Sequence, residues 1–232
     1  METISLAFMR QAILAVLLAI CAAPALAQPD RISQRDALNG LRVALERGAN
    51  AAVAALGRVD GFLGNPQVKI PLPASLERAE RLARRLGFSS EVDELVVAMN
   101  RAAEAAVPEA RKLLLDSVKK MTAQDAKAIL RGSDTAATEY FRKTSNQALR
   151  ERFLPIVRRA TEKVGVAQRY RDFAQPAAAL GVIDSEHADL DEYVTLKALD
   201  GLYLMLGEEE KKIRKDPIGT GSAILRRVFG AL

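Results

Sequence analysis

Apolar residues recur every three or four positions along most of this 232-residue chain, and that spacing is typical of α-helices that bury one face. One segment breaks the pattern: GFLGNPQVKIPLP, from Gly61 to Pro73, contains two glycines and three prolines and cannot be helical. Aromatic residues make up only 5% of the chain and Trp is absent, a composition that disfavours a β-sandwich or barrel. The sequence therefore predicts an all-α fold: one compact multi-helix domain, with an ordered extended loop or a short β-hairpin at residues 61–73.

Helix boundaries follow from capping residues, and they predict roughly eight to ten helices. A Ser or Thr followed three residues later by an acidic residue is a capping-box pattern at a helix start. Gly is common just after a helix end. The predicted starts are Ser33 with Asp36, Ser90 with Asp93 and Thr122 with Asp125, and the predicted ends are Gly57, Gly87 and Gly132.

Two long helical regions are expected in the second half of the chain. The first spans residues 134–164, and we expect it to be interrupted near Ser145 and again at Pro155. The second spans residues 192–215 and ends before Pro217. A short last helix over residues 222–232 has one apolar face, which we expect to pack on the domain rather than lie on a membrane.

The first residues have the pattern of an export signal. An uninterrupted apolar run over residues 12–20 follows Arg10 and precedes the motif Ala25-Leu26-Ala27. A basic start, a short apolar core and an A-x-A exit describe a signal peptide. We therefore expect residues 1–27 to be removed, leaving a single helical domain over 28–232 in the periplasm.

Cys21 is the only cysteine, and it lies inside this predicted signal. A lipoprotein signal places a small residue before the cysteine, whereas this chain has Ile20 there. A soluble mature protein without thiol chemistry is therefore favoured over a form anchored to lipid at Cys21. Synthesis could start at Met1 or at Met9, because Met9-Arg10 makes the better basic start.

Charge and motif content exclude several function classes. The net charge of +5 is mild, and the basic clusters 84–85 and 211–215 lie in or beside amphipathic helices, so we expect solvated faces and no nucleic-acid partner. The only histidine, His187, stands in a polar linker, so no metal site or Ser-His-Asp arrangement is expected. GTGS at residues 219–222 lacks the ending of a P-loop and is expected to cap the last helix. No cofactor is expected.

One polar pair stands out in the segment MNRAAEAAVPEA. At 100° per residue, Asn100 and Glu104 fall one turn apart on the shoulder of the apolar stripe, among small alanines that would let another segment approach. Such a pair could hydrogen-bond the backbone of a loop that has no ladder of its own. It could instead line a pocket.

The loop and this pair together form the candidate binding site. Its apolar side chains are too many for a free linker, and Asn65-Pro66 is a turn signal. We expect a crevice between loop and helix that is apolar with a few polar groups, as ligand sites are. The candidate residues are Phe62, Asn65, Val68, Ile70, Asn100 and Glu104.

Five segments taken together resemble a known family. They are DGFLGNPQVKIPLP, MNRAAEAAVPEA, DAKAILRG, YFRKTSNQALRERFLPIV and GTGSAILRRVFG. The chain resembles, over about residues 30–232, the exported bacterial family catalogued as domain of unknown function 4197. The resemblance implies a helical periplasmic protein and supplies no reaction, ligand or catalytic residue.

Two functions of different classes remain open. The leading hypothesis is a non-catalytic periplasmic domain that binds a protein partner or a small apolar ligand. The alternative is a periplasmic enzyme acting on cell-envelope glycans or peptides with Glu104 and Glu139 as acid and base, assisted by Tyr140 or Asn100. The alternative requires two carboxyl groups about 5 to 10 Å apart in one open cleft.

Overall fold

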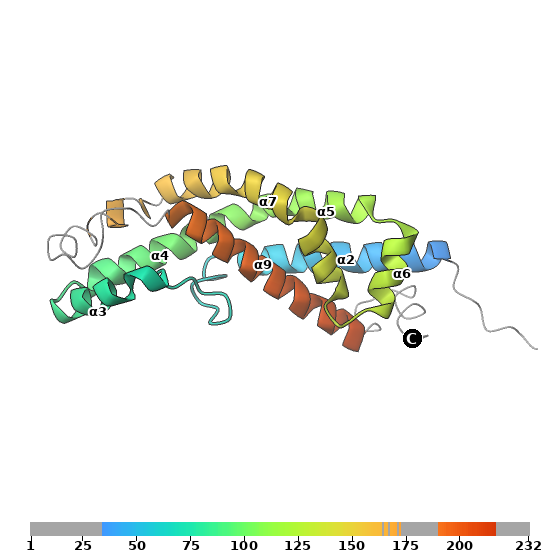
Figure 1. The fold of residues 1–232 in the computed structure, drawn as a ribbon, viewed down its shortest axis with the longest axis horizontal. Coiled ribbons are helices and arrows are strands. Elements are labelled where there is room, and N and C mark those ends of the chain that lie inside the picture. Colours follow the sequence, from blue (N-terminus) through green and yellow to red (C-terminus); the bar gives the residue numbers. More distant parts are fainter. Residues whose placement is uncertain (1–33, 164, 167, 171, 173–189, 217–232) are drawn as a thin grey trace, which may run out of the picture. The chain divides into compact units, whose positions relative to one another are not determined.

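All regular structure in the described part of the chain is helical. A computed structural model describes residues 34–163, 165–166, 168–170, 172 and 190–216 (Figure 1). These residues form seven α-helices and two short 3-10 helices, so the predicted all-α class is confirmed. The α-helices are α2 (Gln34–Leu56), α3 (Glu77–Arg85), α4 (Ser89–Ala106), α5 (Ala110–Lys120), α6 (Ala123–Arg131), α7 (Ala136–Lys163) and α9 (Leu190–Lys215), and the 3-10 helices are η1 (Ala74–Leu76) and η2 (Val107–Glu109).

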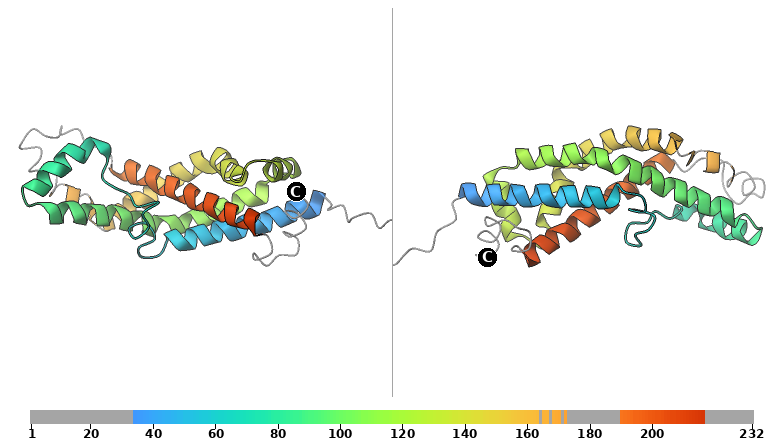
Figure 2. Two further views of the ribbon diagram at one scale, coloured as in Figure 1. Left: turned by 90° about the horizontal axis from the view of Figure 1, so that it is seen from below. Right: turned by 180° about the vertical axis from the view of Figure 1, so that it is seen from behind.

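The helices pack in crossing pairs around one core. α4 continues through η2 into α5 along nearly the same line (Figure 2). α9 packs against both α7 and α2 and crosses them at an angle (Figures 1 and 2). The large side chains that are fully buried come from the helices and from the loop after α2 alike: Leu41, Leu56, Phe62, Ile70, Leu95, Met99, Leu114, Met121, Phe141, Phe153 and Tyr203.

Glycines end three of the helices where the sequence predicts. α2 ends at Leu56, directly before Gly57, and α6 ends at Arg131, directly before Gly132. Gly87 follows α3 with a φ of 92°, a left-handed conformation that Gly adopts at little cost. The three predicted ends are therefore confirmed.

Of the three predicted capping boxes, the one at Ser33 lies outside the described residues, and only one of the other two is present. Thr122 Oγ1 accepts from Asp125 N at 3.1 Å, and Thr122 N donates to Asp125 Oδ2 at 2.9 Å. Hydrogen bonds from Thr122 lower the pKa of the Asp125 carboxyl. The box at Ser90 was wrong, because α4 begins at Ser89 without a side-chain cap and Asp93 accepts a hydrogen bond from Arg84 at 2.8 Å instead.

The predicted interruptions of the long helix were also wrong, since α7 runs without a break from Ala136 to Lys163. The Ser145 hydroxyl donates to the Phe141 carbonyl one turn back, so it does not compete with the helix. Pro155 lies on the exposed side, and so does Glu151, whose carbonyl loses its helical partner to the proline and can bond to water. Burial of the opposite face outweighs the remaining cost of the proline.

α7 begins against a carboxylate from α9. Glu210 accepts hydrogen bonds from Ala137 N at 2.9 Å and from Thr138 N at 2.8 Å, two of the amides left without partners at a helix start. Thr138 Oγ1 adds a third hydrogen bond at 2.8 Å. Arg214 pairs with the same carboxylate at 2.8 Å, so the buried charge is neutralised.

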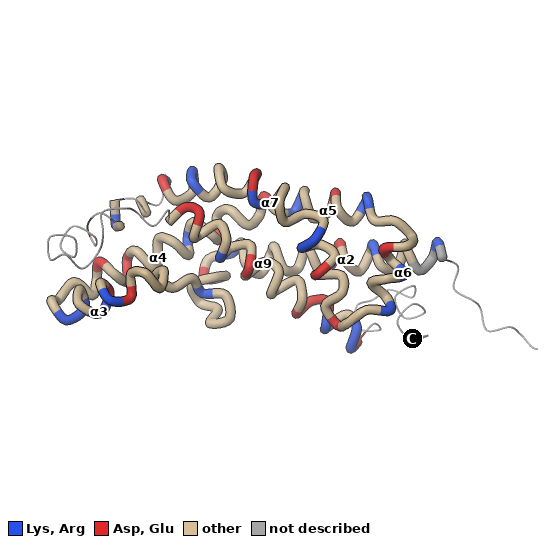
Figure 3. Tube along the Cα trace, in the orientation of Figure 1, with Lys and Arg blue, Asp and Glu red and all other residues tan. Residues whose placement is uncertain are grey.

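Several predictions fall on residues outside the described part. These are the signal peptide, His187, the GTGS turn and the helix over 222–232. Backbone contacts divide the chain into the units Met1–Ile32 and Ser33–Leu232, and every described residue belongs to the second. Among the helices of the described part, none is both long enough and apolar enough to cross a membrane. Basic and acidic residues are interleaved along these helices (Figure 3).

Candidate functional site

The loop between α2 and η1, residues 57–73, reverses sharply as it leaves the helix. It consists of turns and irregular chain, with no strand in these residues. Asp60 has a φ of 64°, which is uncommon for a residue with a side chain. Gly61 follows where a Cβ would lie 2.3 Å from the carbonyl oxygen of Leu56. The close approach of loop and helix end therefore depends on a residue without a side chain.

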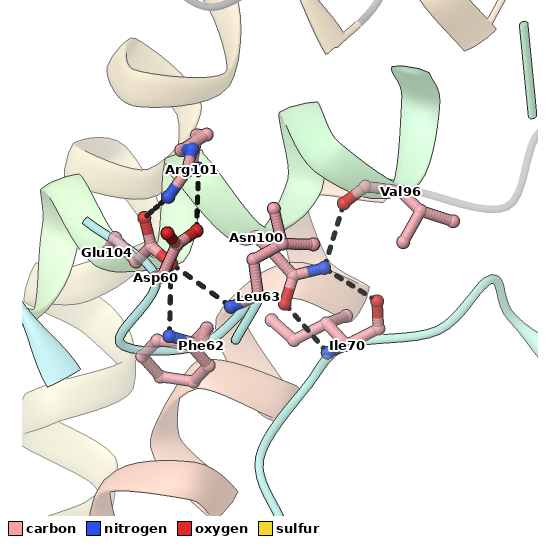
Figure 4. Close-up of polar contacts among 8 residues, drawn as sticks. All are labelled: Asp60, Phe62, Leu63, Ile70, Val96, Asn100, Arg101 and Glu104. Atoms are coloured by element: carbon pink, nitrogen blue, oxygen red, sulfur yellow. Dashed lines mark hydrogen bonds and ion pairs between the residues drawn. The ribbon is translucent and has the colours of Figure 1, made fainter. Parts of the chain in front are cut away.

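Glu104 of α4 holds the start of the loop. Its Oε1 accepts hydrogen bonds from the backbone amides of Phe62 at 3.0 Å and Leu63 at 3.1 Å (Figure 4). Its Oε2 accepts from Arg101 at 2.6 Å, and Arg101 also donates to Asp60 at 2.8 Å. The hydrogen bond with Glu104, followed by that with Asp60, raises the pKa of Arg101. Glu104 is 4% exposed, so these contacts replace water on both of its oxygens.

Asn100, one turn earlier on α4, holds the loop near its end. Its Oδ1 accepts from Ile70 N at 2.9 Å, and its Nδ2 donates to Ile70 O at 2.8 Å and to Val96 O at 2.8 Å (Figure 4). The side-chain amide thus pairs with Ile70 as a neighbouring strand would. This geometry matches the interpretation that Asn100 and Glu104 hydrogen-bond the backbone of a loop without a ladder.

The apolar side chains of the loop pack into the helical core. Phe62, Val68, Ile70 and Leu72 are all buried. Gly201 of α9 leaves room for them, because a Cβ there would lie 2.8 Å from Phe62 Cε1 and 3.3 Å from Val68 Cβ. The sequence analysis did not identify this glycine, because its partners lie more than 130 positions away along the chain.

Two further side chains fix the far half of the loop. Asn65 Oδ1 accepts from Gln67 N at 3.1 Å, which closes the predicted turn locally. Tyr193 of α9 donates its hydroxyl to Pro71 O at 3.0 Å. Burial raises the pKa of this tyrosine, so it remains a donor at neutral pH.

A cleft of about 490 Å³ lies between the loop, α7 and α9. One wall is the loop segment 67–71, and the others are the first turns of α7 and one face of α9. Val68, Gly201 and Leu204 contribute apolar surface. The charged lining residues are Lys69, Glu139, Arg142, Lys197, Asp200, Glu208 and Lys211.

Only one of the six candidate residues lines the cleft. Val68 lines the cleft, and Phe62 and Ile70 belong to the core behind it. Asn65 shapes the turn, as described above, and does not line the cleft. Asn100 and Glu104 bond to the loop backbone and do not line the cleft either.

The acidic pair of the enzymatic alternative does not share this cleft. Glu139 lines it, whereas Glu104 is buried against the loop backbone. Tyr140 lines a different cleft, of about 470 Å³, between α5 and α7. In the part of the chain that the structure describes, no group of three or more His, Cys, Asp or Glu side chains could hold a metal ion.

Arg142 is one of the cleft residues that the sequence analysis missed. Its guanidinium carbon lies 4.5 Å from the centroid of the Tyr203 ring, and one of its nitrogens lies 3.7 Å from Asp200. The contact forms only where α7 meets α9, so no local pattern around Arg142 predicts it. The charges and the apolar groups together make the cleft suitable for a polar ligand with some apolar surface.

The fold and the site together define the class of protein. It is an all-helical domain in which buried polar side chains fix a loop, and the loop borders a charged cleft. The chain belongs to the family described as "Protein of unknown function (DUF4197)", whose model matches residues 31–230. This confirms the family expected from the sequence. Comparison with curated proteins and with solved structures found no match.

Proposed function

We propose that this protein is a non-catalytic binding domain of the bacterial envelope, and that it binds a partner protein through the cleft beside the loop. The observation that carries the proposal is the position of the loop. Two buried polar side chains of α4 fix its backbone, and the fixed segment 67–71 forms one wall of the cleft. A cleft of about 490 Å³ is also within the usual size range of ligand sites.

The lining favours a protein segment over a small apolar ligand. Sites for apolar ligands are lined mainly by hydrophobic and aromatic groups, whereas seven charged residues line this cleft. The charges have both signs, and the apolar groups Val68, Pro71 and Leu204 lie among them. A peptide offers the matching mixture of polar backbone, charge and apolar side chains.

The six candidate residues take different parts in this proposal. Val68 contacts the partner directly. Phe62, Asn65, Ile70, Asn100 and Glu104 hold the loop in the geometry that forms the wall. Binding to a wall that is already ordered avoids the entropy cost of ordering it in the complex.

Site-specific photo-crosslinking in the native bacterium tests the proposal. A photoreactive amino acid would replace Gln67 in the loop or Leu204 in α9, both exposed cleft residues, or Lys127 on α6 as a control outside the cleft. We expect an adduct with the same protein at both cleft positions and not at the control. Equal adducts at all three positions, or none at the two cleft positions, would contradict the proposal.

The proposed location is the periplasm, and it rests on the signal pattern of the first residues. Mass spectrometry of the protein purified from the envelope fraction should find an unmodified chain that begins at Gln28. A lipid-modified Cys21 as first residue would instead place the protein on a membrane.

A further inference from the structure

Arg142 stacks on the buried ring of Tyr203 at the cleft. The guanidinium carbon is 4.5 Å from the centre of the Tyr203 ring, within the range of a cation–π contact. Tyr203 is 1% exposed and belongs to the core. The long side chain of Arg142 is therefore restrained before any ligand arrives, and binding loses less side-chain entropy.

The donors of Arg142 remain available. Its nearest acidic neighbour, Asp200, is 3.7 Å away, which is longer than a hydrogen bond. A guanidinium carries five N–H donors, and Arg142 donates none of them to a described residue. Its side chain is 44% exposed and lines the cleft.

Two lysines add to the positive charge of the cleft. Lys69 extends from the loop beside Val68, and Lys197 lies one turn before Gly201 on α9. Neither forms an ion pair with a residue that the structure describes, and Lys197 approaches only the Tyr193 ring, at 5.9 Å. Four cations and three acids line the cleft, and since Lys211 pairs with Glu208, the remaining cations Lys69, Arg142 and Lys197 face Glu139 and Asp200. That excess of positive charge is complementary to an anionic group.

We propose that Arg142 binds a carboxylate of the peptide segment that occupies the cleft, with Lys69 and Lys197 attracting it. This inference rests on the proposed function and names the chemical group that the site selects. The planar guanidinium can bind a carboxylate through two parallel hydrogen bonds. A carboxylate is the anionic group that an unmodified peptide carries, in Asp and Glu side chains and at its C-terminus.

A matched pair of peptides provides the test. Two capped pentapeptides, identical except for a central Glu or Gln, would be titrated into the mature protein while the backbone amide signals of Gly201 and Gly207, which line the cleft, are followed by NMR. We expect the Glu peptide to bind roughly three to ten times more tightly, as a partly exposed charged hydrogen bond would give. The preference should weaken as salt is added.

Variants of Arg142 separate the guanidinium from charge alone. Arg142→Gln should remove the preference for Glu, and Arg142→Lys should keep only part of it, because lysine lacks the planar fork. Arg81→Gln on α3, which removes an exposed arginine outside the cleft, is the control and should leave the preference unchanged.

The outcomes distinguish this inference from the proposed function. If both peptides shift the cleft signals with equal affinity, the carboxylate inference is wrong and the cleft remains a peptide site. A preference for Glu that survives in Arg142→Gln also overturns the inference. If the Glu peptide does not bind at all, the inference fails, and the crosslinking experiment alone decides the proposed function.

Discussion

Two buried glutamates do the same chemical task in two different settings. Glu104 accepts from the amides of Phe62 and Leu63 in the loop, and Glu210 accepts from Ala137 and Thr138 at the start of α7. Each is at least 94% buried, and each pairs with an arginine within one turn of its own helix. The difference lies in what else holds the amides that each carboxylate binds.

The helix has support that the loop lacks. Past its first turn, α7 continues through its own hydrogen bonds and packs on α4, α5 and α9. The loop has no ladder: turns satisfy some of its amides through backbone carbonyls, whereas those of Phe62, Leu63 and Ile70 depend on side chains of α4. The conformation of the loop therefore depends more on Glu104 than the conformation of α7 depends on Glu210. The loss of stability on removing a buried acceptor therefore depends on whether its donors can find another partner.

The largest effect is expected from Glu104→Ala. The substitution leaves the amides of Phe62 and Leu63 without an acceptor and Arg101 without its buried partner. We expect a loss of about 3 to 5 kcal/mol in the free energy of unfolding, as for other broken buried pairs. Denaturant unfolding measures the loss, and hydrogen exchange should show unprotected amides at Phe62 and Leu63 while Ile70 stays bonded to Asn100.

Glu109→Ala is the control for this variant, because Glu109 is exposed in η2 just beyond the same helix. It should change stability by about 0.5 kcal/mol or less. Normal protection of the Phe62 amide in Glu104→Ala would show that the carboxylate does not hold the loop.

Glu210→Ala should cost less, about 2 to 3 kcal/mol, since α7 can fray by a turn and let water reach its first amides. Its control is Glu209→Ala, the adjacent residue, which pairs with Lys212 near the surface and should cost well under 1 kcal/mol. Denaturant unfolding of the four variants gives the ranking. A larger loss for Glu210→Ala than for Glu104→Ala would reverse the comparison.

The sequence predicted the Glu104 region better than the Glu210 region, and the reason is physical. Asn100 and Glu104 stand out as polar residues on an apolar shoulder beside a segment that needs hydrogen-bond partners. Glu210 is one of three consecutive glutamates, which suggests a solvated surface. One signal was present, because Glu210 continues the helical spacing from Leu206 to Ile213.

Helix ends were predictable where a glycine acts locally, and less so where packing decides. Gly87 ends α3 in a left-handed conformation, and Gly57 and Gly132 end their helices where a Cβ would lie 2.9 Å from Pro108 and 2.5 Å from Ala136. The continuity of α7 through Pro155 depends on burial of the opposite face, which comes from distant parts of the chain. The cleft at Arg142 was not predictable for the same reason, because it requires the relative positions of α7, α9 and the loop.

Gly201→Ala tests whether packing also holds the loop. The added Cβ would lie 2.8 Å from Phe62, so Phe62 and Val68 must shift. Overpacking costs about 1 to 3 kcal/mol, and the gain in helix propensity returns roughly 1, so we expect a net loss of about 0 to 2 kcal/mol by denaturant unfolding. Gly207→Ala on the same helix is the control: its Cβ would meet nothing closer than 3.5 Å, so it should be neutral or stabilising. If the two variants behave alike, the loop does not press on α9.

The smallest effect concerns a buried polar group that has no partner. Thr195 of α9 is 0% exposed, and its hydroxyl has no hydrogen-bond partner in the described part of the chain. An unpaired buried hydroxyl costs about 1 to 3 kcal/mol, and valine has nearly the same shape, so Thr195→Val should stabilise by about 1 kcal/mol. Thr138→Val makes the same change where the hydroxyl donates to Glu210, and it should destabilise by about 1 kcal/mol. Shifts of opposite sign in the melting temperature of the two variants, a few degrees apart, would show that a buried hydroxyl stabilises the fold only when it has a hydrogen-bond partner. A destabilised Thr195→Val would mean that its hydroxyl has a partner after all, and the contrast with Glu104 and Glu210 would be lost.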